Sequence, residues 1–284
     1  MSWPLVSLVL CAAVLHAAWN ALIKASGDKA VDTALVLVLA SLLVLPACVW
    51  VGLPRPEAWP YLAVSLLIHA GYHVALVGAY RHGDLGLTYP IMRGLAPMLV
   101  ALSSTALIGE VPSILAWLGI IGITTGVAFV GLAHPGQALH HRKALAFAVA
   151  NAGLIAAYTL VDGMGVRASG HALQYILALS VLNGIAYPLL VWTRRSTAAR
   201  RELMAHARTR WPVALLGGGA SVAAYGIVLW AMTQAPVASV AALRETSVLF
   251  AAVIGTLVLK ERFGLMRAAG TLVLVGGVMA LRFG

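Results

Sequence analysis

The chain has 284 residues, of which 61% are hydrophobic and only 10% are charged. Soluble domains carry about 25% charged residues, so this composition excludes a soluble globular protein and makes lipid the solvent of the fold. The formal net charge of +10 therefore indicates basic loops beside anionic lipid headgroups, and no nucleic-acid partner is expected.

Ten stretches of the chain have the length and composition of membrane spans, which need about 20 mostly apolar residues. They are residues 3–23, 31–51, 59–80, 86–108, 112–133, 143–164, 172–192, 211–233, 236–258 and 264–282. The longest connection, Thr193–Arg210, is a basic strip that we expect at the membrane surface. Because only helices can span the bilayer with loops this short, the sequence predicts an all-α membrane protein with ten transmembrane helices.

The first and third predicted helices each carry polar and aromatic side chains near one face. These residues are His16, Trp19 and Asn20 in the first helix, and His69, Tyr72 and His73 in the third. Two histidines four residues apart have a metal-ligand spacing, but no acidic or cysteine ligand accompanies them and H-E-x-x-H is absent. A polar cavity wall, hydrogen bonds between helices and a metal site are the three interpretations, and we predict no metal.

Arg93 and Arg244 lie inside the fourth and ninth predicted helices, and Glu245 follows Arg244 directly. A charged residue at mid-helix costs roughly 2.5–3.5 kcal/mol on insertion scales, so such residues face the bundle interior and have partners. Two interpretations follow. The charges form an anion-binding or coupling site, or they form an internal ion pair that pins the fourth and ninth helices together.

The sixth predicted helix carries Asn151, Tyr158 and Asp162 on one face, at spacings of seven and four residues. Asp162 is close to the predicted helix end. It either lines a cavity, as a coupling or ion-pair residue, or lies at the membrane interface.

The stretch from Tyr89 to Val127 occurs a second time, 151 positions further along the chain. Under this shift Arg93 aligns with Arg244, Glu110 with Glu261, Gly119 with Gly270, and Gly126 with Gly277. Ten helices in two copies give five helices each, and because five is odd the second copy enters the membrane from the opposite side. The repeats are therefore predicted to be inverted, an arrangement in which transporters place their substrate near the midplane.

Catalytic and nucleotide-binding motifs are absent from the sequence: it has no G-x-S-x-G, no Walker loop and no carboxylates paired at enzyme spacing. We therefore expect no catalytic residue, no cofactor and no enzyme activity. Any transport must follow a gradient.

The distribution of lysine and arginine predicts the orientation in the membrane. The loops after odd-numbered helices hold most of the basic residues, whereas the opposite side holds only Arg55, Arg167 and Arg282. The positive-inside rule then places the odd loops in the cytoplasm and both termini outside.

The residues described so far resemble a known family. Ten spans in two halves, the turns Gly109-Glu110 and Lys260-Glu261, and the glycine-containing helix after each turn are similar to the EamA repeat of the drug/metabolite transporter superfamily. The opening His16–Lys24, "HAAWNALIK", resembles the first helix of the same group. The resemblance implies a first repeat over residues 1–138 (helices 1–5) and a second over residues 139–284 (helices 6–10).

Members of this family move small metabolites, including amino acids, across the bacterial inner membrane, often as exporters, and bind them in a central cavity. The resemblance implies a substrate-binding set of His16, Trp19, Asn20, His69, Tyr72, His73, Tyr89, Arg93, Tyr158, Tyr225 and Arg244, with Asp162 and Glu245 as coupling or ion-pair residues. Ten-span relatives usually have both termini in the cytoplasm, so the charge distribution and the family habit disagree about orientation.

The sequence therefore predicts a multi-pass inner-membrane exporter of small polar or amphipathic metabolites, such as amino acids or related organic ions. It would work by alternating access as a monomer or homodimer in the lipid bilayer. One alternative is a carrier of quaternary ammonium or other organic cations, held in an aromatic cage. The alternative from another class is an intramembrane metalloenzyme that uses His69 and His73.

Overall fold

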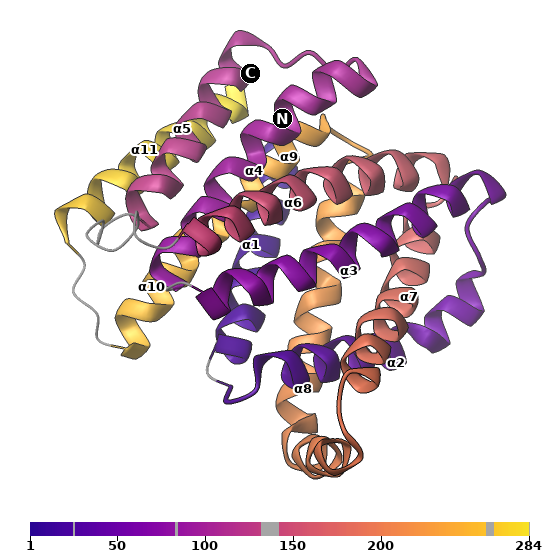
Figure 1. Ribbon diagram of the computed structural model, residues 1–284. Coiled ribbons are helices and arrows are strands. Elements are labelled where there is room, and N and C mark those ends of the chain that lie inside the picture. The colour runs from indigo at the N-terminus through magenta and orange to yellow at the C-terminus, as the bar shows by residue number, and fades with distance from the viewer. Residues whose placement is uncertain (25, 83–84, 132–141, 260–263, 284) are drawn as a thin grey trace.

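The computed structural model describes residues 1–284 apart from 25, 83–84, 132–141, 260–263 and 284, and the described residues form a bundle of helices (Figure 1). The helices are α1 (Trp3–Lys24), α2 (Lys29–Val51), a 3₁₀ turn η1 (Pro56–Ala58), α3 (Trp59–His82), α4 (Leu85–Ile108), α5 (Ile114–Gly131), α6 (Arg142–Ala168), α7 (Ala172–Thr193), α8 (Thr197–Ala231), α9 (Val237–Arg244), α10 (Ser247–Leu259) and α11 (Leu265–Phe283). The predicted boundary at residues 138 and 139 lies outside the described residues.

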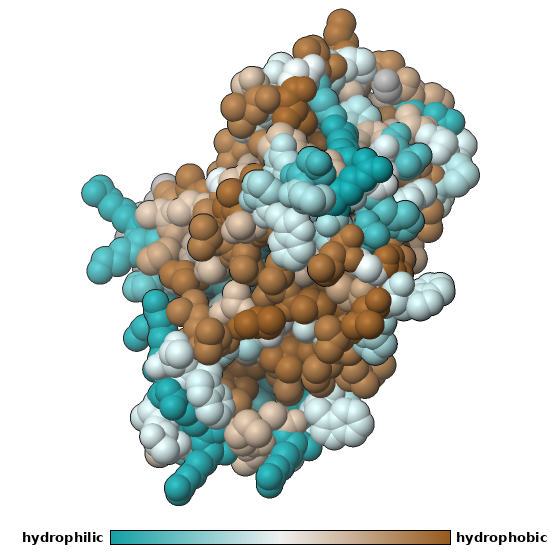
Figure 2. Space-filling view, turned by 90° about the vertical axis from the view of Figure 1, so that its right-hand side faces the viewer, coloured by the Kyte–Doolittle hydropathy of each residue, from teal (hydrophilic) through white to brown (hydrophobic). Residues whose placement is uncertain are grey.

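The outer surface of the bundle is apolar. Figure 2 shows hydrophobic residues across the middle of one face, with hydrophilic residues gathered towards its lower end and in a patch above. Large apolar side chains such as Val49, Trp50 and Ile114 are at least 80% exposed. Within the described residues, 7 helices are long and apolar enough to cross a membrane, and the stretches Ile114–Val130 and Ala268–Phe283 are shorter apolar helices. The chain is a multi-pass membrane protein, as its composition predicts.

The ten predicted spans are confirmed, with two differences in how they are built. The ninth span is not one continuous helix, because α9 ends at Arg244 and α10 begins at Ser247. The eighth helix starts at Thr197, well before the predicted residue 211, so most of the supposed loop Thr193–Arg210 is helical.

This basic extension of α8 is capped at its start and bent at its junction with the span. The Ser196 hydroxyl accepts a hydrogen bond from the Ala199 amide at 3.3 Å, which satisfies one of the donors left open at a helix N-terminus. Pro212 lies inside α8, where it removes one helical hydrogen bond and favours a kink. Figure 1 shows the first turns of α8 at the bottom of the bundle, at an angle to the rest of the helix.

The helix contacts follow the symmetry of an inverted repeat. The second helices of the two halves, α2 and α7, pack on each other, as do the fifth helices, α5 and α11. The remaining main contacts come as equivalent pairs, with α3 on α6 and α8 on α1. Each half therefore presents the same surfaces to the other, and the prediction of two inverted five-helix repeats is confirmed.

The glycines of the repeat explain why α5 and α11 pack so closely. A Cβ atom built on Gly119 would lie 2.8 Å from the Gly277 carbonyl oxygen, and one built on Gly126 would lie 2.7 Å from the Gly270 carbonyl oxygen. Exchanging the two repeats turns the first of these contacts into the second. Backbone approach of this kind requires glycine, because any side chain would meet the facing main chain.

The two ends of the bundle carry different contacts between segments. At one end the Met1 ammonium donates to the Arg282 carbonyl oxygen at 3.2 Å, and the Arg55 amide donates to the Ser169 carbonyl oxygen at 3.3 Å. At the other end Arg195 pairs with Asp28 at 2.6 Å. Both termini therefore lie with the even-numbered loops, as an even number of spans requires.

The glycine contact generates a test with a neighbouring control. In Gly277→Ala the new Cβ would lie 2.7 Å from the Ile123 backbone nitrogen, so the two helices must separate, and we expect a loss of about 1–3 kcal/mol in stability. At Gly276 a Cβ would meet nothing within 4 Å, so Gly276→Ala should keep or raise the melting temperature of the purified protein. Equal melting temperatures for the two variants would contradict the packing argument.

Candidate functional site

The break between α9 and α10 places a short non-helical turn in the interior of the bundle. Glu245 and Thr246 form the turn, and their amides donate to the carbonyl oxygens of Ala242 and Leu243, both at 3.1 Å. The Thr246 hydroxyl donates to the Leu243 oxygen at 2.7 Å. At this turn, from Arg244 to Thr246, hydrogen bonds to the residue three positions earlier take the place of the usual α-helical bonds. Non-helical backbone at membrane depth occurs where it is buried in protein or lines a cavity.

Two arginines share one carboxylate at this break. Arg93 Nη1 donates to both carboxylate oxygens of Glu245 at 3.2 Å. Arg244 donates to Glu245 Oε1 through Nε at 3.2 Å and through Nη2 at 3.0 Å. Arg93, Arg244 and Glu245 are at most 4% exposed. We call these three residues the charge cluster, and its formal charge is +1, since two guanidinium groups face one carboxylate.

The first helix closes one side of the charge cluster. His16 Nε2 contacts Arg93 Nη2, and the Trp19 indole nitrogen donates to His16 Nδ1 at 3.3 Å. Asn20 does not point at the cluster, because its amide donates to the His16 carbonyl oxygen of its own helix at 2.7 Å. The cluster thus joins α1 and α4 of the first repeat to the α9–α10 turn of the second.

Aromatic side chains from α3 and α6 cover another side. The Arg244 guanidinium carbon lies 5.8 Å from the centre of the Tyr158 ring, within the range of a cation–π contact. His69 stacks on Tyr158 with ring centres 4.3 Å apart, and Tyr72 meets Tyr158 edge-on at 5.7 Å. The three rings therefore form an aromatic layer that packs against the charge cluster.

Asp162 lies behind this aromatic layer and is completely buried inside the protein. Its two carboxylate oxygens accept hydrogen bonds from the phenols of Tyr175 at 2.8 Å and Tyr225 at 2.6 Å. Within the described residues these two tyrosines, and not a cation, supply the hydrogen bonds to Asp162. Tyr175 escaped the sequence reasoning because a single tyrosine in an apolar helix carries no distinguishing pattern.

The two histidines of α3 have separate partners. His69 Nδ1 lies 3.0 Å from the Ser65 carbonyl oxygen and 3.1 Å from its hydroxyl, and the His73 ring lies 4.2 Å from that of Tyr187. Within the described part of the chain, no three His, Cys, Asp or Glu residues gather into a group that could hold a metal ion. Both histidines are buried among these partners. The side chain of the remaining candidate, Tyr89, is outside the described residues.

The Glu110 of the repeat signature forms a second polar contact between the halves. Gly109 is the first residue after α4 and has a φ of +68°. This backbone conformation favours glycine. Glu110 then accepts hydrogen bonds from Arg167 Nη1 at 2.5 Å and from the backbone amide of Val237 at 2.8 Å. A carboxylate at the first amide of α9 is favoured by the helix dipole. We call this contact the Glu110–Arg167 latch. Its counterpart in the second repeat, Glu261, is outside the described residues.

Arg167 belongs to α6 of the second repeat, and its other hydrogen bonds also go to that repeat. Its Nε donates to the Met232 carbonyl oxygen at 2.8 Å, and its Nη2 donates to that of Ala235 at 3.2 Å. The latch therefore holds the start of α9, whose last residue is Arg244 of the charge cluster.

Comparisons with known proteins agree with this architecture. The sequence matches the EamA-like transporter family over residues 3–132 and 142–283. A solved structure described as "Crystal structure of protein" superimposes with a TM-score of 0.76 and 15% sequence identity, covering 98% of this chain and 95% of that chain. At this identity the likeness concerns the fold alone. A search of curated proteins finds no match.

The charge cluster predicts a large effect of removing its single carboxylate. Glu245→Gln would leave two buried guanidinium groups without a counter-charge, and breaking a buried pair in this way costs about 3–5 kcal/mol. We expect a marked fall in melting temperature and in yield of purified protein. Glu57→Gln removes an exposed carboxylate and should change neither quantity. Wild-type stability in Glu245→Gln would show that the arginines do not depend on this partner.

Proposed function

We propose that this chain, which belongs to the EamA-like transporter family, is a secondary carrier that binds small metabolites with an anionic group at the charge cluster. The family is one of transporters and not of enzymes, so a metalloenzyme built on His69 and His73 is no longer considered. Amino acids and related organic acids combine a carboxylate with polar and apolar parts and fit the surroundings of the cluster.

The observation that carries this proposal is the excess of one positive charge in a buried site. The two guanidinium groups and the one carboxylate give the cluster a net positive charge, which attracts an anionic ligand in a medium of low dielectric constant. Arginine favours carboxylates because its planar fork can donate two parallel hydrogen bonds. Tyr72, which is half-buried and edge-on to Tyr158, provides an aromatic surface for the rest of the ligand.

The competing proposal, an organic cation in an aromatic cage, is less well supported. The Tyr158 face that such a cage would use already has the Arg244 guanidinium 5.8 Å from its centre. A cationic ligand at that face would meet a like charge, which raises its energy in a medium of low dielectric constant.

Alternating access is supported by polar contacts between the halves at both ends of the bundle. At the end with the even-numbered loops, the Glu110–Arg167 latch joins the first repeat to the second. At the other end, Asp28 pairs with Arg195, and Asp32 pairs with His206 at 2.5 Å. A carrier that opens to one side at a time would release one set while the other holds.

The Asp28–Arg195 pair is charged at neutral pH. Partial burial raises the pKa of the Asp28 carboxyl, but the hydrogen bond from Arg195 and backbone amides outweigh that effect and hold its pKa below the usual value. The pair should therefore be lost only as the pH falls below the usual carboxyl range of about 4.

Export across the bacterial inner membrane, as the family resemblance implies, is part of this proposal.

The role of the arginines can be separated from their contribution to stability. In Arg93→Gln the remaining Arg244–Glu245 pair is neutral, so we expect affinity for an anionic ligand to fall about tenfold or more. Arg93→Lys should be nearly as damaging because lysine offers a point charge without the fork. Thermal-shift screening with amino acids, carboxylates and quaternary ammonium compounds identifies the ligand, and titration then gives the affinity per folded molecule.

Arg55→Gln is the control for this series, since Arg55 is exposed and lies in a connection between helices. If Arg93→Gln binds normally but melts at a lower temperature, the arginines act as a structural ion pair only. Stabilisation by quaternary ammonium compounds alone would favour the cation carrier.

Orientation is tested by cysteine labelling after Cys11 and Cys48 have been replaced. Because the basic residues gather at the end that contains Ser196, we expect Ser196→Cys to be protected from an impermeant reagent added to intact cells. Glu57→Cys, exposed in an even-numbered loop, should be labelled. The reverse pattern would place both termini in the cytoplasm, as in the relatives.

A further inference from the structure

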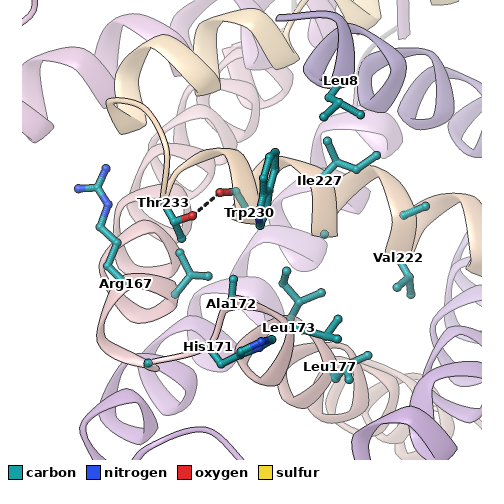
Figure 3. Close-up of a pocket in the computed structure, with 15 residues that line it drawn as sticks. Leu8, Arg167, His171, Ala172, Leu173, Leu177, Val222, Ile227, Trp230 and Thr233 are labelled. Carbon is teal, nitrogen blue, oxygen red and sulfur yellow. Dashed lines mark hydrogen bonds between the residues drawn. The ribbon is translucent and has the colours of Figure 1, made fainter. Parts of the chain in front are cut away.

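A groove unrelated to the charge cluster runs between α7 and α8 (Figure 3). It has a volume of about 830 Å³, and the start of α1 and the end of α6 complete its walls. Its rim side chains Leu8, Leu173 and Trp230 are 41–42% exposed. Large apolar residues at the rim of a membrane protein face lipid, so the groove is open to the bilayer.

The lining is apolar along most of its length and polar at one end. Val222, Ile227 and Leu177 belong to the apolar part. Arg167, His171 and Thr233 line the end near the α6–α7 turn and the end of α8, and Figure 3 shows Arg167 beyond His171 on that side. The Thr233 hydroxyl already donates to the Trp230 carbonyl oxygen at 2.7 Å, so Arg167 and His171 are the groups that can receive a ligand there.

The length of the groove matches one leaflet of a bilayer. Its lining residues on α8 run from Val222 to Trp230, and Thr233 follows just beyond the helix end. At about 1.5 Å per residue, the α8 part corresponds to roughly 12 Å along the helix. The hydrocarbon core of a bilayer is about 30 Å thick. Because the polar end lies where the helices end, the groove extends from the membrane interface to about the midplane.

The polar end carries groups that can bind a phosphate. The Arg167 side chain is 37% exposed, and its three hydrogen bonds to Glu110, Met232 and Ala235 use three of the five N–H groups of a guanidinium. His171 is exposed and its side chain makes no capping bond to α7. A Cβ atom on Gly170 would lie 2.5 Å from Arg55 Nε, so a second guanidinium stands beside this end of the groove.

We propose that the groove is a binding site for one glycerophospholipid of the surrounding bilayer. One acyl chain lies along α7 and α8, between Leu177 and Val222, and the phosphate lies at the polar end, beside Arg167 and His171. A chain that reaches the midplane and a phosphate at the interface are the two parts of a lipid in one leaflet. The apolar length and the basic end of the groove match these parts in order.

The test measures retention of phosphatidylglycerol by the purified full chain, using native mass spectrometry after detergent exchange. Ala223→Phe places a ring in the groove from an exposed position of α8 and should abolish retention. His171→Glu sets a carboxylate against the phosphate and should weaken binding about tenfold. Ala150→Phe makes the same change at an exposed site on α6, away from the groove, and should retain lipid as the wild type does.

Three results would overturn the assignment. The first is a wild-type protein that retains no phosphatidylglycerol, and the second is equal retention by wild type, Ala223→Phe and His171→Glu. The third is equal retention of diacylglycerol, which has the two chains but lacks the phosphate. Melting temperatures of all variants, recorded without added lipid, separate a loss of lipid from a loss of folding.

Discussion

The bundle depends on how two buried guanidinium groups are neutralised inside a membrane. Arg93 comes from the first repeat and Arg244 from the second, and the carboxylate that serves both is Glu245. A cation left alone in lipid is too costly to retain, so each half requires the other to complete its interior. This shared counter-ion links the halves at the position where an alternating-access carrier must also allow them to move.

The contacts around this cluster follow the symmetry of the repeats, but the cluster itself departs from that symmetry at one position. The glycines of α5 and α11 meet in equivalent pairs across the two repeats, and the helix contacts come as matching sets. The arginines are also equivalent, but Glu245 aligns with Gly94 of the first repeat. The second repeat therefore supplies the only carboxylate at this level of the alignment, and the cluster keeps one positive charge more than it neutralises.

The sequence was sufficient for the fold because its strongest signals are physical requirements. Apolar length, scarcity of charge and the shifted copy of Tyr89–Val127 predict ten spans and their inversion. Arg93 and Arg244 were also predictable as interior residues, since an exposed arginine at that depth is unfavourable. The partner of a charge is harder to predict, because it depends on which helices meet.

Three features escaped prediction for related reasons. The break at Glu245 follows from local hydrogen bonds, which an apolar window of 20 residues does not detect. The helical extension before Pro212 has the composition of a surface loop, yet a cap at Ser196 and good helix formers keep it helical. The hydrogen bond from Tyr175 to Asp162 joins α7 to α6. The pattern of residues within either helix does not predict a contact between the two helices.

The short helix α9 gives the protein a mechanical connection between its interior and its surface. It is a strut of 8 residues, about 12 Å long at the usual helical rise, with the Glu110–Arg167 latch at one end and Arg244 at the other. A helix of this length moves as a rigid body. If the charge cluster binds a ligand as proposed, a displacement of Arg244 would also shift the other end of α9, where the Val237 amide donates to Glu110 at 2.8 Å. One short helix would then connect the proposed binding site directly to the contact at the end of the bundle.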